Sequence, residues 1–198
     1  MEQSNDVLNK VEEFATEMIK NDVSEAFIYH DLNHTLHVVE GVKAIGQGSE
    51  LSPEDLELVT IAAWFHDTGY KNGCAKHEEG GALIARNFLE SIDYPKEDIS
   101  KIEGCIMASQ MPQNPTNLLE EVLCDADLSH LASKDYAEMA DKMHREMEHV
   151  KGEKIPEEQW DEMNYKFVRE HKYITNYGKK VLEPVKKKNL KSIKKKSK

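Results

Sequence analysis

The chain has 198 residues, enough for one domain with a sizeable core, and no apolar run approaches the length of a membrane span. Its three cysteines, an odd number without short paired spacings, indicate reduced thiols rather than disulfides or a zinc knuckle. The polar start is not a signal peptide, so we expect a cytoplasmic protein with no membrane partner.

Charge is divided unevenly along the chain. Eight lysines and no acid follow position 185, whereas the remainder holds 18 basic residues against 37 acidic ones, a net charge of −19. A body this acidic disfavours long nucleic acids, although a bound metal can still recruit a small phosphate. The lysine-rich tail is typical of a solvated, frayed end, but Leu190 and Ile193 lie three apart and could pack a final helix.

Apolar residues recur at helical spacing through most of the chain, which predicts an all-α domain. Ser52 and Pro53 are typical of a helix start, and Gly69 can end that helix in the left-handed cap conformation. The aromatic stripe from Trp160 to Tyr177 is more typical of a core than of a cofactor site. The helices predicted in this way cover residues 4–20, 29–48, 52–67, 77–89, 99–106, 118–131, 133–152 and 156–178.

The pair His66 and Asp67 stands at the end of the helix predicted over 52–67, on its apolar stripe. We expect both side chains to face inward, where a buried charge needs a partner such as a cation. By itself, an adjacent histidine and aspartate are more often a capped or hydrogen-bonded pair. Other polar residues of the chain therefore have to support a metal site.

Two more apolar stripes carry such residues. His34 lies on the core-facing stripe of the helix predicted over 29–48, where a lone histidine is usually a hydrogen-bonded core residue. Asp127 falls among apolar residues of the helix predicted over 118–131, while Asp125 points elsewhere and could cap or support the site. With the histidine–aspartate pair, these positions supply two nitrogens and two carboxylates from three helices, a set that suits a divalent metal.

Three further side chains could act on a substrate. His30 lies one turn before His34 if the helix reaches back that far, and two imidazoles four residues apart can serve as two ligands, or as a ligand and a proton donor. The turn-rich loop that follows Gly69 leaves the end of the helix directly, so Lys71 and His77 can also reach the site.

These motifs, in their order along the chain, resemble the HD-domain superfamily of metal-dependent phosphohydrolases. The resemblance covers about residues 25–135 and rests on YHDLNH at 29–34, FHDTG at 65–69 and DADL at 125–128. It implies a compact single-domain helical bundle that binds one or two divalent ions, with Mn, Fe, Co, Ni, Zn and Mg not distinguished. The implied ligands are His34, His66, Asp67 and Asp127, with Asp67 able to bridge a second ion.

The resemblance also implies candidate catalytic residues. The start of this region is similar to that of cyclic-nucleotide phosphodiesterase domains, in which the histidine at the His30 position protonates the leaving oxygen. His77 and Glu78 resemble the histidine–glutamate stretch of many bacterial HD proteins, which makes His77 the second candidate proton donor. The chain departs from the family at Tyr70, where a lysine is common and where Lys71 comes next. The glutamine-bearing pocket of the animal phosphodiesterases is not matched.

The implied function is hydrolysis of a phosphate ester or phosphodiester of a small nucleotide, including a cyclic nucleotide, by metal-activated water. The alternatives are a metal- and nucleotide-binding sensor without turnover, and a helical adaptor with a structural metal. We expect an N-terminal helix over 1–24 that packs on the domain, and the HD core over 25–135. Helices over 136–185 would complete the same domain before the tail over 186–198, and the oligomeric state is left open.

Overall fold

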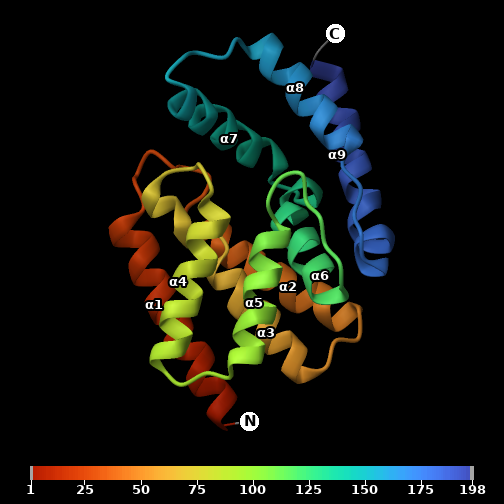
Figure 1. Cartoon of the computed structure of the whole chain (residues 1–198). Coiled ribbons are helices and arrows are strands. Elements are labelled where there is room, and N and C mark those ends of the chain that lie inside the picture. The colour runs from red at the N-terminus through yellow and green to blue at the C-terminus, as the bar shows by residue number, and fades with distance from the viewer. Residues whose placement is uncertain (1, 197–198) are drawn as a thin grey trace.

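The computed structural model describes residues 2–196, with side chains from 6 to 193, and over this range the chain is all-α, as predicted (Figure 1). None of the described helices is both long and apolar enough to cross a membrane. The elements are α1 (Glu2–Asp22), α2 (Leu32–Gly48), α3 (Pro53–Phe65), η1 (Thr68–Asn72), α4 (His77–Ser91), α5 (Lys96–Ala108), α6 (Leu118–Asp127), η2 (Leu128–Ala132), α7 (Tyr136–Lys151), α8 (Glu157–Glu170), η3 (Gly178–Leu182) and α9 (Glu183–Lys196).

Helix α3 lies at the centre of the fold, where it packs against α1, α2, α4, α5 and α6. Its residues from Leu58 to Phe65 are all buried, so α3 is enclosed on every side rather than along one stripe. Ser52 caps its start, as predicted, by accepting a hydrogen bond from the backbone nitrogen of Asp55 at 3.0 Å. The residues that directly follow α3 are therefore held by a helix that is packed all round.

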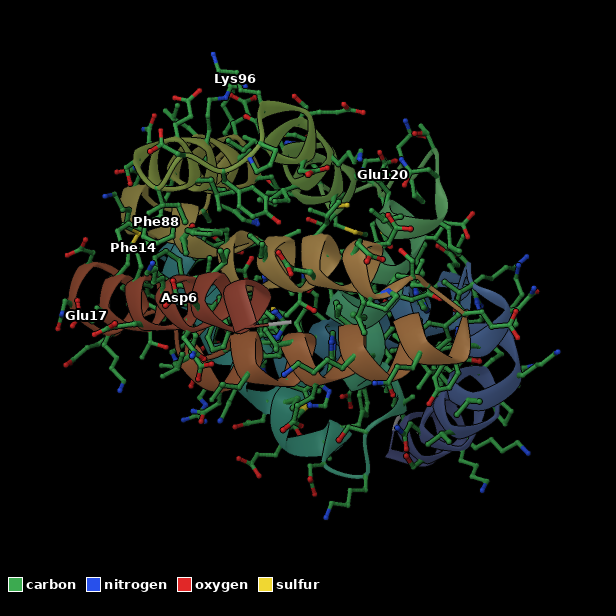
Figure 2. The ribbon with its side chains drawn as sticks, turned by 90° about the horizontal axis from the view of Figure 1, so that it is seen from below. Asp6, Phe14, Glu17, Phe88, Lys96 and Glu120 are labelled. Carbon is green, nitrogen blue, oxygen red and sulfur yellow. The ribbon has the colours of Figure 1, made fainter. Side chains whose placement is uncertain are left out.

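An aromatic cluster joins α1 to α3 and α4. Phe14 stacks on Phe88 with ring centroids 4.4 Å apart, and Figure 2 shows the two labels side by side where α1 meets α4. Phe14 also lies 6.0 Å from Phe65, the last residue of α3. Aromatic pairs at these distances stabilise the packing beyond the area they bury, so α1 is fixed against the end of α3.

Gly69 does not end α3 in the left-handed conformation, contrary to the prediction. The helix ends at Phe65, and Gly69 lies inside the short 3-10 helix η1 without a positive φ. A Cβ atom at this position would lie 1.9 Å from the carbonyl oxygen of His77 and 2.7 Å from the backbone nitrogen of Gly81. Gly69 is thus needed for the close approach of α4, which brings His77 toward the end of α3.

The single helix predicted over 156–178 is also wrong, because α8 ends at Glu170 and a non-helical segment follows. The carboxylate of Asp125 accounts for the break. Its Oδ1 accepts a hydrogen bond from the backbone nitrogen of Ile174 at 2.8 Å, and its Oδ2 accepts from the nitrogen and hydroxyl of Thr175 at 2.9 and 2.7 Å. Asp125 thereby caps this segment and ties the C-terminal helices to α6.

The lysine-rich end is not frayed over the residues that the structure describes. Helix α9 packs along α8, and Ile193 is buried against Leu128, Leu131, Tyr136 and Val168, as the spacing of Leu190 and Ile193 allowed. The lysines from position 194 onward lie outside the described side chains. The segment boundaries at residues 24, 135 and 185 stay a prediction.

Candidate metal centre

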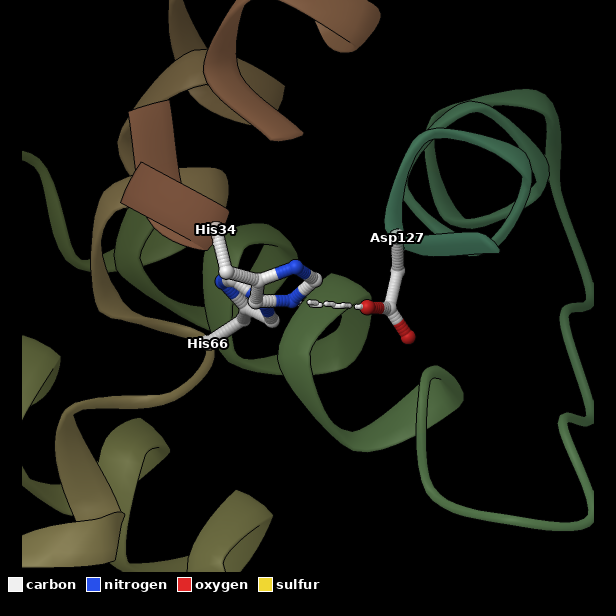
Figure 3. A group of neighbouring side chains, drawn as sticks. All are labelled: His34, His66 and Asp127. Carbon is white, nitrogen blue, oxygen red and sulfur yellow. Dashed lines mark hydrogen bonds and ion pairs between the residues drawn. The ribbon is translucent and has the colours of Figure 1, made fainter. Parts of the chain in front are cut away.

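Three segments bring His34, His66 and Asp127 together (Figure 3). His34 lies in the first turn of α2, His66 directly follows α3, and Asp127 is the last residue of α6. Asp31 fixes the start of α2, because its side chain accepts a hydrogen bond from the backbone nitrogen of His34 at 3.0 Å. Figure 3 shows the two imidazoles together, with the carboxylate of Asp127 reaching them from a separate helix.

The side-chain atoms converge with those of Asp67. His34 Nε2 lies 3.3 Å from both Asp67 Oδ2 and Asp127 Oδ1, while His66 Nε2 lies 3.2 and 3.8 Å from these two oxygens. The two imidazole nitrogens are 3.4 Å apart. Ligands held about 2.1 Å from a zinc-like ion lie about 3.0–3.4 Å from one another in octahedral or tetrahedral geometry. His34, His66 and Asp127 therefore form a group that could hold a metal ion, and Asp67 Oδ2 lies at ligand spacing from both imidazoles.

The chemistry of these atoms also calls for a cation between them. His66 Nδ1 donates to the carbonyl oxygen of Ala63 at 2.7 Å, so in the neutral ring the lone pair of Nε2 faces the cluster. Asp67 Oδ2 is buried and accepts no well-aligned hydrogen bond from the described residues. Nitrogen and oxygen lone pairs that face one another repel unless a proton or a metal cation lies between them.

The ionisation of the cluster fits the same interpretation. Burial raises the pKa of Asp67, but the charge of His66 and the nearby imidazole of His34 outweigh burial and hold this pKa well below its usual range. Burial lowers the pKa of His34, but hydrogen bonds to Asp127 and Asp67 and their charges raise it to about 10. A proton therefore occupies the cluster when no metal does, and a divalent ion would displace it.

Tyr70 contacts both candidate proton donors. Its ring stacks on that of His30 with centroids 4.4 Å apart, and it lies tilted against the ring of His77 at 4.1 Å. His77 Nδ1 donates to the carbonyl oxygen of Cys74 at 3.0 Å, and its Nε2 lies 3.6 Å from Asp67 Oδ1. The tyrosine at the family's lysine position thus packs against both imidazoles, whose own ring centroids lie 6.4 Å apart.

His30 is not part of α2, which begins at Leu32, so it does not lie one helical turn before His34. Glu146 of α7 holds it instead. Glu146 Oε2 accepts hydrogen bonds from the backbone nitrogens of Tyr29 and His30 at 2.8 and 3.1 Å, and Glu146 Oε1 bonds to His30 Nδ1. These contacts orient the imidazole and leave its Nε2 as the nitrogen available to a substrate.

Sequence reasoning did not single out Glu146, although its side chain is only 3 % exposed. The signal was present, because Glu146 is next to Met147 and continues a stripe of methionines on α7. A carboxylate on an apolar stripe needs a partner, as was argued for Asp127. What the sequence could not show is that the partner lies on a segment 116 residues earlier.

Lys71 is not brought to the cluster. Its ammonium lies 4.0 Å from the carboxylate of Asp22, its side chain is about a third exposed, and it does not line the cavity beside the cluster. The short helix η1 carries Tyr70 toward the histidines and Lys71 toward α1. The geometry of the described residues gives Lys71 no catalytic contact.

A cavity of about 390 Å³ adjoins the cluster. Asp67 and Asp127 line it, and so do His30, His77 and Glu78. The carboxylates that could hold a metal and the imidazoles that could move a proton therefore border the same space. A small molecule in the cavity could contact both sets of groups at once.

Comparison with known proteins places these observations in a family. The model of the HD domain matches residues 31–189. A crystal structure of a predicted HD superfamily hydrolase from an uncultured Thermotogales bacterium resembles this fold with a TM-score of 0.57 and 22 % sequence identity, over 82 % of this chain and 87 % of that one. Among curated proteins, no sequence matches the chain. Because the family model spans most of its length, the chain belongs to the HD domain family.

Proposed function

We propose that the protein is a metal-dependent phosphohydrolase that cleaves a phosphate ester or phosphodiester. The observation that carries this proposal is the convergence of His34, His66, Asp67 and Asp127 beside a cavity that His30 and His77 also line. The hydrolase class is also supported by the similar fold of the predicted HD superfamily hydrolase from the Thermotogales bacterium. A divalent ion held by these four residues would supply a Lewis acid and a water of lowered pKa.

The two oxygens of Asp67 face different groups, so this carboxylate could bind a second ion as well as the first. Oδ2 points to the imidazoles of His34 and His66, at 3.3 and 3.2 Å. Oδ1 lies 3.6 Å from His77 Nε2, and Glu78 Oε1 lies 3.4 Å from the same nitrogen. A carboxylate placed in this way can bind one ion through each oxygen.

His30 is the residue that we propose as proton donor to the departing oxygen. Glu146 holds its Nδ1 and the backbone around it, so the imidazole has one orientation and presents Nε2 toward the cavity that it lines. His77, whose Nδ1 donates to one backbone carbonyl, is the second candidate for this role. The nucleotide substrate and the cytoplasmic location stay predictions from the sequence.

The test compares two histidines of the same helix. His34→Ala should lose the bound metal and the metal-dependent hydrolysis of bis(p-nitrophenyl) phosphate together, whereas His37→Ala, on α2 but outside the cluster, should keep both. Metal content is measured by elemental analysis, and turnover by nitrophenolate release after stripping and restoring Mn²⁺. Metal binding without turnover of any phosphate ester would refute the hydrolase and favour the sensor alternative. Turnover that survives His34→Ala would refute the metal site.

A further inference from the structure

We propose that the substrate joins a single phosphate group to an apolar body, alkyl or aromatic, that lies between α7 and α8. This inference names the substrate class of the site and rests on the proposed function. It follows from three properties of the 390 Å³ cavity: the side chains that form its walls, the charges that it lacks, and the few hydrogen-bonding groups that it offers.

Methionines form much of the wall away from the metal cluster. Five of the chain's eight methionines line the cavity, and three of them recur every fourth residue on the inner face of α7. Methionine side chains are flexible and polarizable, so they adapt to apolar ligands of varied shape. Trp160, Phe167 and Leu131 extend the same surface. The methionines are Met111, Met139, Met143, Met147 and Met163.

Apart from its histidines, the cavity has no basic side chain among the described residues to receive a second phosphate. No lysine or arginine lines it within the part of the chain that the structure describes. Its ionisable groups are histidines, tyrosines and the three carboxylates of Asp67, Glu78 and Asp127. Phosphate recognition beyond a metal ion relies on arginine or lysine, and carboxylates repel it. A diphosphate or triphosphate would therefore leave at least one charged group without a partner.

A nucleobase would also find few partners. On the methionine side, the hydroxyl of Tyr136 donates to Asn164 Oδ1 at 2.6 Å, which leaves the amide nitrogen of Asn164 as a donor to a ligand there. The several donors and acceptors of a base edge would lose their bonds to water there, at a cost that an alkyl or phenyl group does not bear. The volume suits a small ligand, since a cavity of about 150 Å³ already holds benzene. These features favour a phosphate joined to an apolar body over the nucleotide substrate that the sequence suggested.

Alkylphosphonates test this inference without turnover, because they lack the ester bond. Isothermal titration of the Mn²⁺-loaded protein with methyl- to octylphosphonate should give affinity that rises about fourfold per methylene until the cavity is filled. Hexylphosphonate should bind more tightly than AMP or ADP. Met143→Gln and Met163→Gln, on opposite walls of the cavity, should each roughly halve the gain in binding free energy per methylene. Met107→Gln, at an exposed methionine outside the cavity, is the matched control and should leave the gain unchanged.

The outcomes separate this inference from the proposed function. Affinity that does not depend on chain length, or that favours AMP or ADP over hexylphosphonate, would overturn the apolar substrate even if phosphate esters are hydrolysed. An equal effect of Met107→Gln and Met143→Gln would overturn the assignment of the apolar body to this cavity. A steep dependence on chain length without hydrolysis of any ester would support the apolar site and refute the phosphohydrolase.

Discussion

Removing residues 186–198 should destabilise the whole domain, because α9 is part of its packing. Ile193 is only 6 % exposed, and the loss of a buried isoleucine side chain costs about 2–5 kcal/mol. Asn189 donates to the carbonyl oxygens of Leu131 and Ser133 at 2.9 and 2.8 Å, each bond contributing about 1 kcal/mol. Together these terms predict a loss of about 4–7 kcal/mol in the free energy of unfolding, which lowers the melting temperature by about 10–25 °C in a chain of this size.

Circular dichroism melting of the full chain and of a chain that ends at Val185 measures this loss. Ile193→Ala alone should account for about half of it. The control replaces Lys187, Lys188 and Lys191, which are exposed, with glutamine and should melt as the full chain does, because surface charges contribute little. If the shortened chain melts with the full one, α9 does not stabilise the domain. If the lysine control melts as low as the shortened chain, charge rather than packing is responsible.

Three other changes test the site and its surroundings. Asp67→Asn should remove the metal, and full occupancy by elemental analysis would contradict the bridging position of this carboxylate. Glu146→Gln should keep the metal but slow hydrolysis of alkyl esters by a factor of roughly 10–10², and that of nitrophenyl esters by less, because it loosens the proposed donor His30 without removing it. Equal losses of rate on both substrates would show a purely structural role. Burial and the charge of Lys186 lower the pKa of His171 to about 4, so the unfolded chain binds this proton at a higher pH than the folded one. Up to about 3 kcal/mol of stability, present above pH 6.5, is therefore lost as the pH falls toward 4. His171→Gln should flatten this part of a plot of unfolding free energy against pH, and an unchanged slope would contradict the lowered pKa.

The candidate ligands could be found from the sequence because each is a polar residue on an apolar stripe. Burial of such a residue requires a partner, and the structure brings His34, His66 and Asp127 into one group that could hold a metal ion. The all-α fold followed from periodicity in the same way and is confirmed. The start of α2 could also have been predicted, since Asp31 is a favoured N-cap residue. The predicted helix began too early, at residue 29, because it included the motif that contains His30.

What the sequence could not show depends on contacts between distant segments. Glu146 reaches His30 across 116 residues, and Asp125 binds backbone nitrogens almost 50 residues further on, where local periodicity predicts a continuous helix. The placement of Lys71 depends on the path of η1, because adjacent residues of such a helix point in different directions. The cavity itself required the relative positions of α7 and α8, which no local pattern encodes.

The hydrogen bonds from Ile174 and Thr175 to the carboxylate of Asp125 should restrict the motion of the C-terminal helices. The amide protons of Ile174 and Thr175 lie outside any helix, yet a buried carboxylate accepts both, so they should exchange with deuterium as slowly as helical amides do. Freeing them requires breaking the bonds to a residue only two positions before Asp127, on the same helix. Opening of the C-terminal helices and loosening of this candidate ligand would then be one cooperative event, visible as a shared exchange rate that slows when metal is bound.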